Sequence, residues 1–205
     1  MRPYSVSYTP ADDSTNGLAT TVNVAAGLPF TQQHTDMGDS LAHLIIITPS
    51  GSITGNFTIT GTDVDGKAQT EVLATDTTNP VTSVNYYLTV TSVLSPAGIG
   101  AETVQIGWTD DVISKTFPID WASSAAHDIY VDISGTINFT VQETFANLLA
   151  GITPSWNAIT ALASKTGDTF GQADIGATAW RLLINSLTSG ATVTIQTSQP
   201  VRASK

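Results

Sequence analysis

The stretch that decides the fold runs from His127 to Thr144 and reads HDIYVDISGTINFTVQET. Apolar and polar side chains alternate on both sides of Gly135, which is typical of two strands that each bury one face. Gly135 tolerates a positive φ, so the SGT sequence around it is suited to a tight turn. The pattern therefore predicts a β-hairpin with one apolar face and one solvated face.

Three other stretches repeat this pattern. The clearer copies are HLIIITPSGSITGNFTITGT (43–62) and WRLLINSLTSGATVTIQT (180–197), and a looser copy is YYLTVTSVLSPAGIGAETVQIGW (86–108). Each is predicted to be a hairpin, and each half of the chain holds two of them around a variable connection. The sequence therefore predicts an all-β fold of two tandem antiparallel, jelly-roll-like β-sandwich modules that arose by duplication, with one intertwined sandwich as the alternative.

The boundaries of the two modules follow from the positions of the repeats. The modules are predicted at 20–112 and 113–205, after an N-terminal arm at 1–19. In the first module, Asp65-Gly66 is predicted to turn a further strand pair. In the second, the connection is long and mixed, and residues 155–163 are predicted to form a short helix.

Duplication also predicts the register of two strands. The sequences NFTITGT (56–62) and NFTVQET (138–144) place a Phe and the next-but-one aliphatic residue on the same pleat face. Phe57 and Phe139 are therefore expected to be buried at equivalent positions, as are Ile59 and Val141. The turns at Ser50-Gly51 and Ser134-Gly135 are expected to superpose.

Composition excludes several classes of partner. The chain has 205 residues, a formal charge of −10, no cysteine and no run of Lys or Arg. Binding to nucleic acid or to an anionic membrane surface requires clustered cations, so neither is predicted as a partner. No apolar run approaches the ~20 residues that span a bilayer, and the N-terminus has no apolar signal core. The absence of cysteine excludes disulfides and thiolate chemistry, and it fits synthesis in a reducing cytoplasm.

No motif indicates catalysis or a bound metal, so neither an enzyme activity nor a cofactor is predicted. A nucleophile elbow, a phosphate-binding loop, a dinucleotide fingerprint and paired metal-binding histidines are all missing from the sequence. Asp63-x-Asp65-Gly66 has the wrong spacing for a calcium loop and is predicted to be a hairpin turn. His43 and His127 precede repeated stretches and are predicted to be structural, although their convergence with His34 on a metal is the alternative.

Tryptophan supplies the candidate contact residues. Trp108 and Trp180 lie on the apolar phase of their strands, so core packing is predicted for both. Trp121 and Trp156 fall in connecting segments, where an exposed ring can stack on a sugar or on a partner protein. Trp121 and Trp156 are therefore the residues predicted to contact a glycan or a partner.

The second half of the chain resembles small virion structural proteins of tailed bacteriophages. The likeness lies in PSWNAITALASKTGDT followed by ATAWRLLINSLTSGATVTIQ (177–196), which is a Trp-containing connection, a strand, a TSG turn and a second strand. Trp180 replaces the aliphatic residue usual in those proteins. VDISGTINFTVQETF (131–145) is similar to the strand that opens the same module. GNFTITGTDVDGKAQTEVL in the first half resembles another β-module of phage structural proteins.

This resemblance implies a non-enzymatic virion component. The expected function is that of a capsid decoration or cement protein, a homo-oligomer that docks on the major capsid protein or other virion proteins. It would reach the virion after synthesis in the cytoplasm of the bacterial host. A neck, tail or fibre-attachment component is one alternative, and a carbohydrate-binding module displayed on the particle is another.

Overall fold

The computed structural model describes residues 2–23, 36–76, 78–95, 101–119 and 126–199. These residues form fifteen β-strands and two short 3-10 helices without an α-helix, which confirms the predicted all-β class. The chain divides into two compact units. Unit 1 consists of Met1–Pro10 and Ser114–Lys205, and unit 2 consists of Ala11–Ile113.

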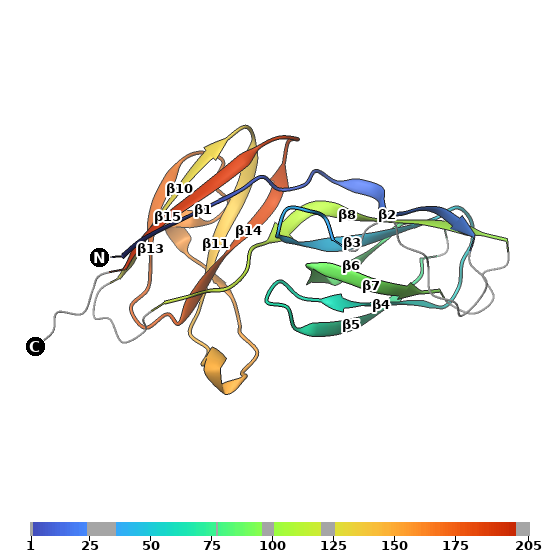
Figure 1. Cartoon of the computed structure of the whole chain (residues 1–205), viewed down its shortest axis with the longest axis horizontal. Helices are drawn as coiled ribbons and strands as arrows, with labels where there is room; N and C mark the ends of the chain where they lie inside the picture. The colour runs from blue at the N-terminus through green and yellow to red at the C-terminus, as the bar shows by residue number, and fades with distance from the viewer. Residues whose placement is uncertain (1, 24–35, 77, 96–100, 120–125, 200–205) are drawn as a thin grey trace, which may run out of the picture. The chain divides into compact units, whose positions relative to one another are not determined.

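Unit 2 contains seven strands, which are β2 (Ser14–Asn23), β3 (Ala42–Pro49), β4 (Asn56–Thr62), β5 (Ala68–Ala74), β6 (Val81–Tyr87), β7 (Thr89–Leu94) and β8 (Thr103–Ile113). They form two antiparallel sheets, in the orders β2-β8-β3-β6 and β5-β4-β7 (Figure 1). Leu18 of β2 and Ile47 of β3 share one buried cluster with Phe57 of β4 and Val90 of β7. Both sheets therefore contribute to a single core, as in a sandwich.

Unit 1 contains β1 (Arg2–Tyr8), β9 (Phe117–Pro118), β10 (His127–Ser134), β11 (Ile137–Thr144), β12 (Asn157–Ala158), β13 (Thr169–Ala173), β14 (Ala179–Leu187) and β15 (Thr192–Gln199), with 3-10 helices η1 (Leu148–Ala150) and η2 (Thr160–Leu162). One antiparallel sheet has the order β1-β15-β10-β13, and the other has β12-β11-β14 with β9 also paired to β14. The Phe117 ring lies 5.5 Å from the Tyr4 ring of the first sheet and stacks at 4.2 Å on Trp180 of the second. These rings join the two layers of unit 1.

The repeated stretches are not hairpins, and that prediction was wrong. Strand β10 pairs with β13 and β15, whereas β11, which follows it directly, pairs with β12 and β14. In the same way, the members of the pairs β3/β4, β7/β8 and β14/β15 lie in different sheets. Each stretch is an arch that crosses from one sheet to the other. Alternation alone does not separate an arch from a hairpin, because every strand buries one face in both.

The two units share one strand topology. The order β2-β8-β3-β6 of unit 2 matches β1-β15-β10-β13 of unit 1, and β5-β4-β7 matches β12-β11-β14. Phe57 and Phe139 are both buried on the corresponding strands β4 and β11, and so are Ile59 and Val141. The predicted register is confirmed, and the common order is what duplication of one module would leave.

The turns that precede these two strands differ. The arch of unit 1 is residues 135–136, where Gly135 has a φ of +85°. The arch of unit 2 is residues 50–55, and its positive φ belongs to Gly55 rather than to Gly51. The expected superposition of the two turns is therefore wrong. Loop length diverged while the register of the strands was kept, because only the register decides which side chains are buried.

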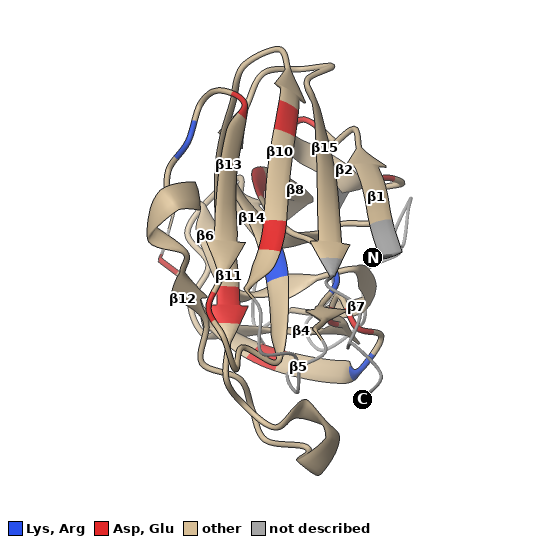
Figure 2. Cartoon of the chain, turned by 90° about the vertical axis from the view of Figure 1, so that its left-hand side faces the viewer, with Lys and Arg blue, Asp and Glu red and all other residues tan. Residues whose placement is uncertain are grey.

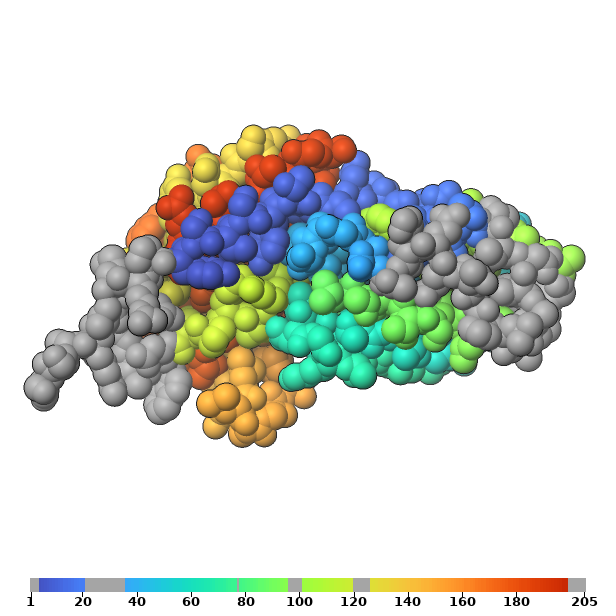
Figure 3. Space-filling model, in the orientation of Figure 1, coloured from blue at the N-terminus to red at the C-terminus, as the bar shows by residue number. Residues whose placement is uncertain are grey.

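The N-terminal residues belong to both units, in place of the predicted separate arm at 1–19. Strand β1 pairs with β15 along its whole length, from Arg2 opposite Gln199 to Tyr8 opposite Val193, and β2 pairs with β8. Figure 3 shows the start of the chain in blue against the last strand in red. Unit 1 is therefore discontinuous in sequence, with unit 2 inserted after its first strand. The division at Ile113 lies next to the predicted boundary between 20–112 and 113–205.

The connection at 155–163 does not form the predicted helix. It contains the short strand β12, which pairs with Gln142 and Glu143 of β11, and then η2. Leu162 of η2 is fully buried. The segment covers a sheet edge and buries only Ile159 and Leu162, which is too short an apolar stripe to stabilise a helix.

Candidate functional site

Trp156, one of the two predicted contact residues, is half-buried and already has a partner. The Arg181 guanidinium carbon lies 4.4 Å from the centre of its ring, and Arg181 Nε donates a 2.8 Å hydrogen bond to Gln142 Oε1. A cation–π contact of this kind occupies one face of the ring. Trp121, the other predicted residue, lies outside the described residues. One face of the Trp156 ring is therefore covered within unit 1, and contact of Trp156 or Trp121 with a glycan or a partner stays a prediction.

The other two tryptophans have packing roles. Trp180 is buried in unit 1, as predicted. Trp108 is half-buried against the core of unit 2, and its Nε1 donates a 2.8 Å hydrogen bond to the carbonyl oxygen of Asp12. The indole of Trp108 thus ties the segment before β2 to β8.

The Asp63 carboxylate is used by a turn, as predicted. Its Oδ1 accepts hydrogen bonds from the backbone N–H groups of Asp65 at 2.9 Å and Lys67 at 2.8 Å, and Gly66 has a φ of +81°. Strands β4 and β5 pair on either side, so this connection is a true hairpin. Among the described residues, no group of three or more His, Asp and Glu side chains is arranged to hold a metal.

His43 and His127 are both buried, which agrees with their predicted structural role. His43 Nε2 lies 2.8 Å from Asp39 Oδ2, and its Nδ1 lies 2.8 Å from the carbonyl oxygen of Thr109. Neither ring nitrogen of His127 has a hydrogen-bond partner within the described structure. Burial lowers the pKa of His127, and the Asp128 charge opposes that shift. His34 lies outside the described residues.

An apolar loop projects from unit 1 between β11 and β12, and it is the first candidate surface (Figure 1). We define the apolar loop as residues 145–152. Leu149 at its tip is 98% exposed, and Phe145 and Ile152 are 50% and 55% exposed. A hollow of about 660 Å³ lies beside the loop and is lined by Phe145, Leu148 and Leu149 together with Ile119.

The backbone of this loop is ordered by its own hydrogen bonds. Asn147 caps η1, with its Oδ1 accepting from Ala150 N at 3.2 Å, and Gly151 closes the helix at a φ of +71°. Thr178 Oγ1 on the neighbouring segment donates to the carbonyl oxygen of Ala146 at 2.7 Å. The loop therefore presents its apolar side chains on a fixed frame.

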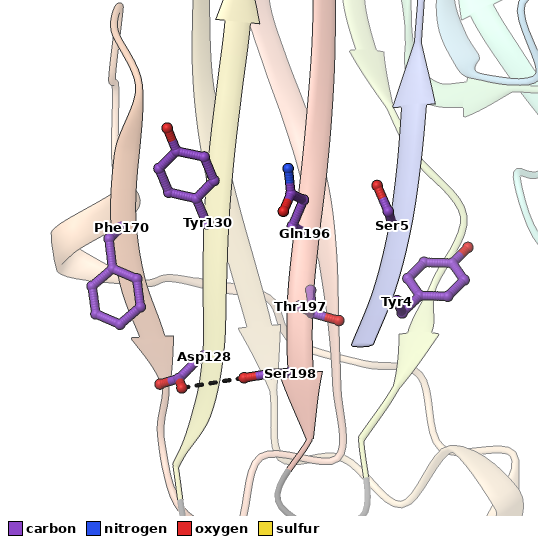
Figure 4. Close-up of a pocket in the computed structure, with 8 residues that line it drawn as sticks. All are labelled: Tyr4, Ser5, Asp128, Tyr130, Phe170, Gln196, Thr197 and Ser198. Atoms are coloured by element: carbon purple, nitrogen blue, oxygen red, sulfur yellow. Dashed lines mark hydrogen bonds between the residues drawn. The ribbon is translucent and has the colours of Figure 1, made fainter. Parts of the chain in front are cut away.

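The second candidate surface is the outer face of the sheet β1-β15-β10-β13. We define the aromatic face by Tyr130, Phe170, Gln196, Asp128 and Gln172, whose side chains alternate with buried ones along their strands. Tyr130 of β10 is paired with Phe170 of β13 on one side and with Gln196 of β15 on the other. Figure 4 shows the two rings on neighbouring strands of this face.

Sequence reasoning missed the aromatic face. The alternation in β10 places Tyr130 on the side opposite the core, but a single outward ring is common on a sheet surface. Phe170 sits in KTGDTFGQADIGA, where nothing indicates which strand lies beside it. The two rings become one surface only through the pairing of β13 with β10.

Comparison with protein-family models matches no family, and no curated protein shows significant sequence similarity to the chain. The described part of the chain contains no apolar helix long enough to cross a membrane. The two candidate surfaces are therefore the features that bear on function.

Proposed function

We propose that this chain is a non-enzymatic virion structural protein of a tailed bacteriophage, namely a capsid decoration protein that stabilises the shell by docking on it. The observation that carries the proposal is the apolar loop of unit 1. Exposed apolar side chains on an ordered frame mark a protein–protein contact, since full burial of a leucine contributes about 1.5–3 kcal/mol. The resemblance of the sequence to phage structural proteins supports the same function.

The low charge and the doubled module also fit this function. Charged residues make up 12% of the chain, against roughly 25% in ordinary globular proteins, so the surface carries few groups whose desolvation opposes docking. A stable interface buries about 1,600 Å² in total. Two units of one topology give a single chain two surfaces with which to contact neighbouring capsomers.

The first experiment measures incorporation into particles of the phage that encodes the chain. Particles that lack the protein are mixed with the purified wild-type chain or with Leu149→Asp, and the bound protein is quantified after sedimentation. Leu149→Asp should bind at least roughly tenfold more weakly, because a charge at the loop tip opposes desolvation. The control is Val84→Asp, which adds the same charge at a valine that is 81% exposed in unit 2 and should bind like the wild type.

Copy number separates decoration from the alternative positions in the particle. A shell protein is expected on the order of hundreds of copies, whereas a neck, tail or fibre-attachment protein forms a ring of on the order of ten. Quantitative mass spectrometry of purified particles measures this number. A ring-sized copy number would replace the decoration function by the neck or tail function, and absence from the particle would overturn the proposal.

A further inference from the structure

We propose that the aromatic face of unit 1 binds a neutral oligosaccharide. This inference does not depend on the docking function proposed above, because it rests on a different sheet and on different residues. The inference rests on the chemistry of two neighbouring rows of side chains on the outer face of β1-β15-β10-β13.

The central row carries the apolar contact area. Across the strands it reads Ser5, Gln196, Tyr130 and Phe170, with each residue directly opposite the next in the antiparallel register. Tyr130 is 39% exposed and Phe170 is 57% exposed. Directly opposed side chains on a sheet have Cβ atoms about 4.5–5.5 Å apart, so the two side chains start side by side. Figure 4 shows their rings turned toward opposite ends of the strands, which spreads the apolar strip lengthwise. The apolar C–H face of a pyranose ring can stack on such a strip.

The adjacent row carries an oriented hydrogen-bond acceptor. Asp128 Oδ1 accepts a 2.7 Å hydrogen bond from Gln172 Nε2, and its Oδ2 accepts a 3.2 Å hydrogen bond from Ser198 Oγ. Figure 4 shows the second of these contacts below the rings. A carboxylate has about four acceptor sites, so both oxygens of Asp128 retain capacity for the hydroxyl groups of a ligand. The Gln196 amide adds a donor and an acceptor in the central row.

Charge restricts the ligand to a neutral one. Strands β10, β13 and β15 contain no Lys or Arg, whereas Asp128 and Asp132 lie on the outward phase of β10. Figure 2 shows the acidic positions of β10 in red. Phosphates, sulfates and acidic sugars would therefore be repelled. A hollow of about 510 Å³ at this face lies within the range of roughly 300–1,000 Å³ found for small-molecule sites. Rings beside hydroxyl-binding groups, without positive charge, match a neutral sugar chain.

The test is affinity electrophoresis of the full chain in native gels. The gels contain laminarin, dextran, hydroxyethylcellulose or soluble glycol chitin as neutral or near-neutral probes, and dextran sulfate as the anionic probe. The wild type should be retarded by at least one neutral polysaccharide and not by dextran sulfate. Tyr130→Ala and Phe170→Ala should each raise the Kd for that polysaccharide roughly tenfold or more, which is about 1.4 kcal/mol.

Two matched variants make the result specific. Phe145→Ala removes an exposed ring of the apolar loop and should leave retardation unchanged, whereas Tyr130→Phe keeps the stacking ring and should retain most of the binding. Thermal melts establish that each variant is folded. The proposal is overturned if no neutral polysaccharide retards the wild type, if only dextran sulfate does, or if both alanine variants bind like the wild type. Loss of particle binding in the alanine variants without any glycan binding would instead assign this face to a protein partner.

Discussion

At the scale of single residues, His127 is an imidazole that the core of unit 1 holds in its neutral form. Both ring nitrogens are buried without a partner in the described structure, and burial lowers the pKa below its ordinary value of 6.5. Below that pH, the unfolded chain binds a proton more readily than the folded chain does. The free energy of unfolding should therefore fall as the pH drops from 6.5 toward the folded-state pKa of His127.

The variant His127→Leu should remove this part of the pH dependence. At neutral pH it should leave unit 1 as stable as the wild type or more stable by up to about 1 kcal/mol, because two unpaired polar atoms leave the core. Urea unfolding, followed by the fluorescence of buried Trp180, measures both effects across the weakly acidic range. Parallel pH profiles for the variant and the wild type would contradict this account of His127.

Asp39 is a buried carboxylate whose stabilising effect is lost only in the acidic range. Burial by itself raises its pKa, but the hydrogen bond and charge of His43 and the N–H groups of Ala11 and Leu41 lower it overall, below the ordinary 3.8. The folded-state pKa is thus depressed. The resulting stabilisation is complete above pH 3.8 and is lost as the pH falls through the folded-state pKa.

Asp39→Asn should destabilise unit 2 by about 3 kcal/mol at neutral pH, because it leaves His43 buried without its carboxylate. The side chains of His43 and Asp39 are 0% and 4% exposed, so solvent does not replace the lost partner. Thermal denaturation of the variant measures the effect, and Asp13→Asn, at an exposed aspartate of the same unit, is the control. Equal melting temperatures for both variants would show that the contact between His43 and Asp39 contributes nothing.

At the scale of elements, the two-residue arch between β10 and β11 depends on Gly135. Its φ of +85° costs a residue with a side chain roughly 1–2 kcal/mol, and an added Cβ would lie 3.0 Å from Ala191 Cβ. Gly190, with a φ of +77°, has no atom within 4 Å of such a Cβ. Gly135→Ala should therefore destabilise unit 1 more than Gly190→Ala does. Urea midpoints compare the two variants, and equal losses would mean that only φ matters.

The burial phase of the strands could be predicted from sequence, but their pairing could not. Period-two alternation correctly placed Phe57 and Phe139 in cores, because it depends only on which face each strand buries. The choice between arch and hairpin depends on whether the next strand continues the same sheet or the opposite one. Both arrangements bury the same residues, so the alternation around Gly135 carries no information about that choice.

At the scale of the whole molecule, strand β1 should be essential to unit 1 and not to unit 2. A chain that lacks residues 1–8 loses the strand beside β15 and the contact of Tyr4 with Phe117. Unit 1 should then melt at a lower temperature, with self-association through the exposed edge of β15. Unit 2 should melt as before.

Calorimetry of the truncated chain resolves the two transitions, and addition of a synthetic peptide of residues 2–8 should restore the transition of unit 1. A peptide of the same composition in scrambled order is the control. If the truncated and full-length chains melt alike, β1 does not complete the sheet.

The discontinuity of unit 1 was not predictable from sequence. The alternation in RPYSVSY (2–8) is typical of a strand, yet it does not indicate whether that strand joins the nearby β2–β8 region or the distant β15. The candidate surfaces could not be predicted from the sequence for a related reason. Tyr130 and Phe170 are separated in sequence and adjacent only across a sheet, and the apolar residues at 145–152 have a composition that is also common in cores.

The pairing of β1 with β15 has a consequence for the order in which the chain folds during synthesis. Arg2 is synthesised long before its partner Gln199. Unit 2, which is continuous, can fold as soon as Ile113 has emerged, whereas β1 must wait as an unpaired strand until β15 has been made. Pairing of two strands so far apart in sequence is slow, and the unpaired β1 is meanwhile exposed to other nascent copies of the chain. The β1–β15 pairing therefore comes after unit 2 can fold, so a ribosome that stops before β15 releases a protein with a finished unit 2 and an unfinished unit 1.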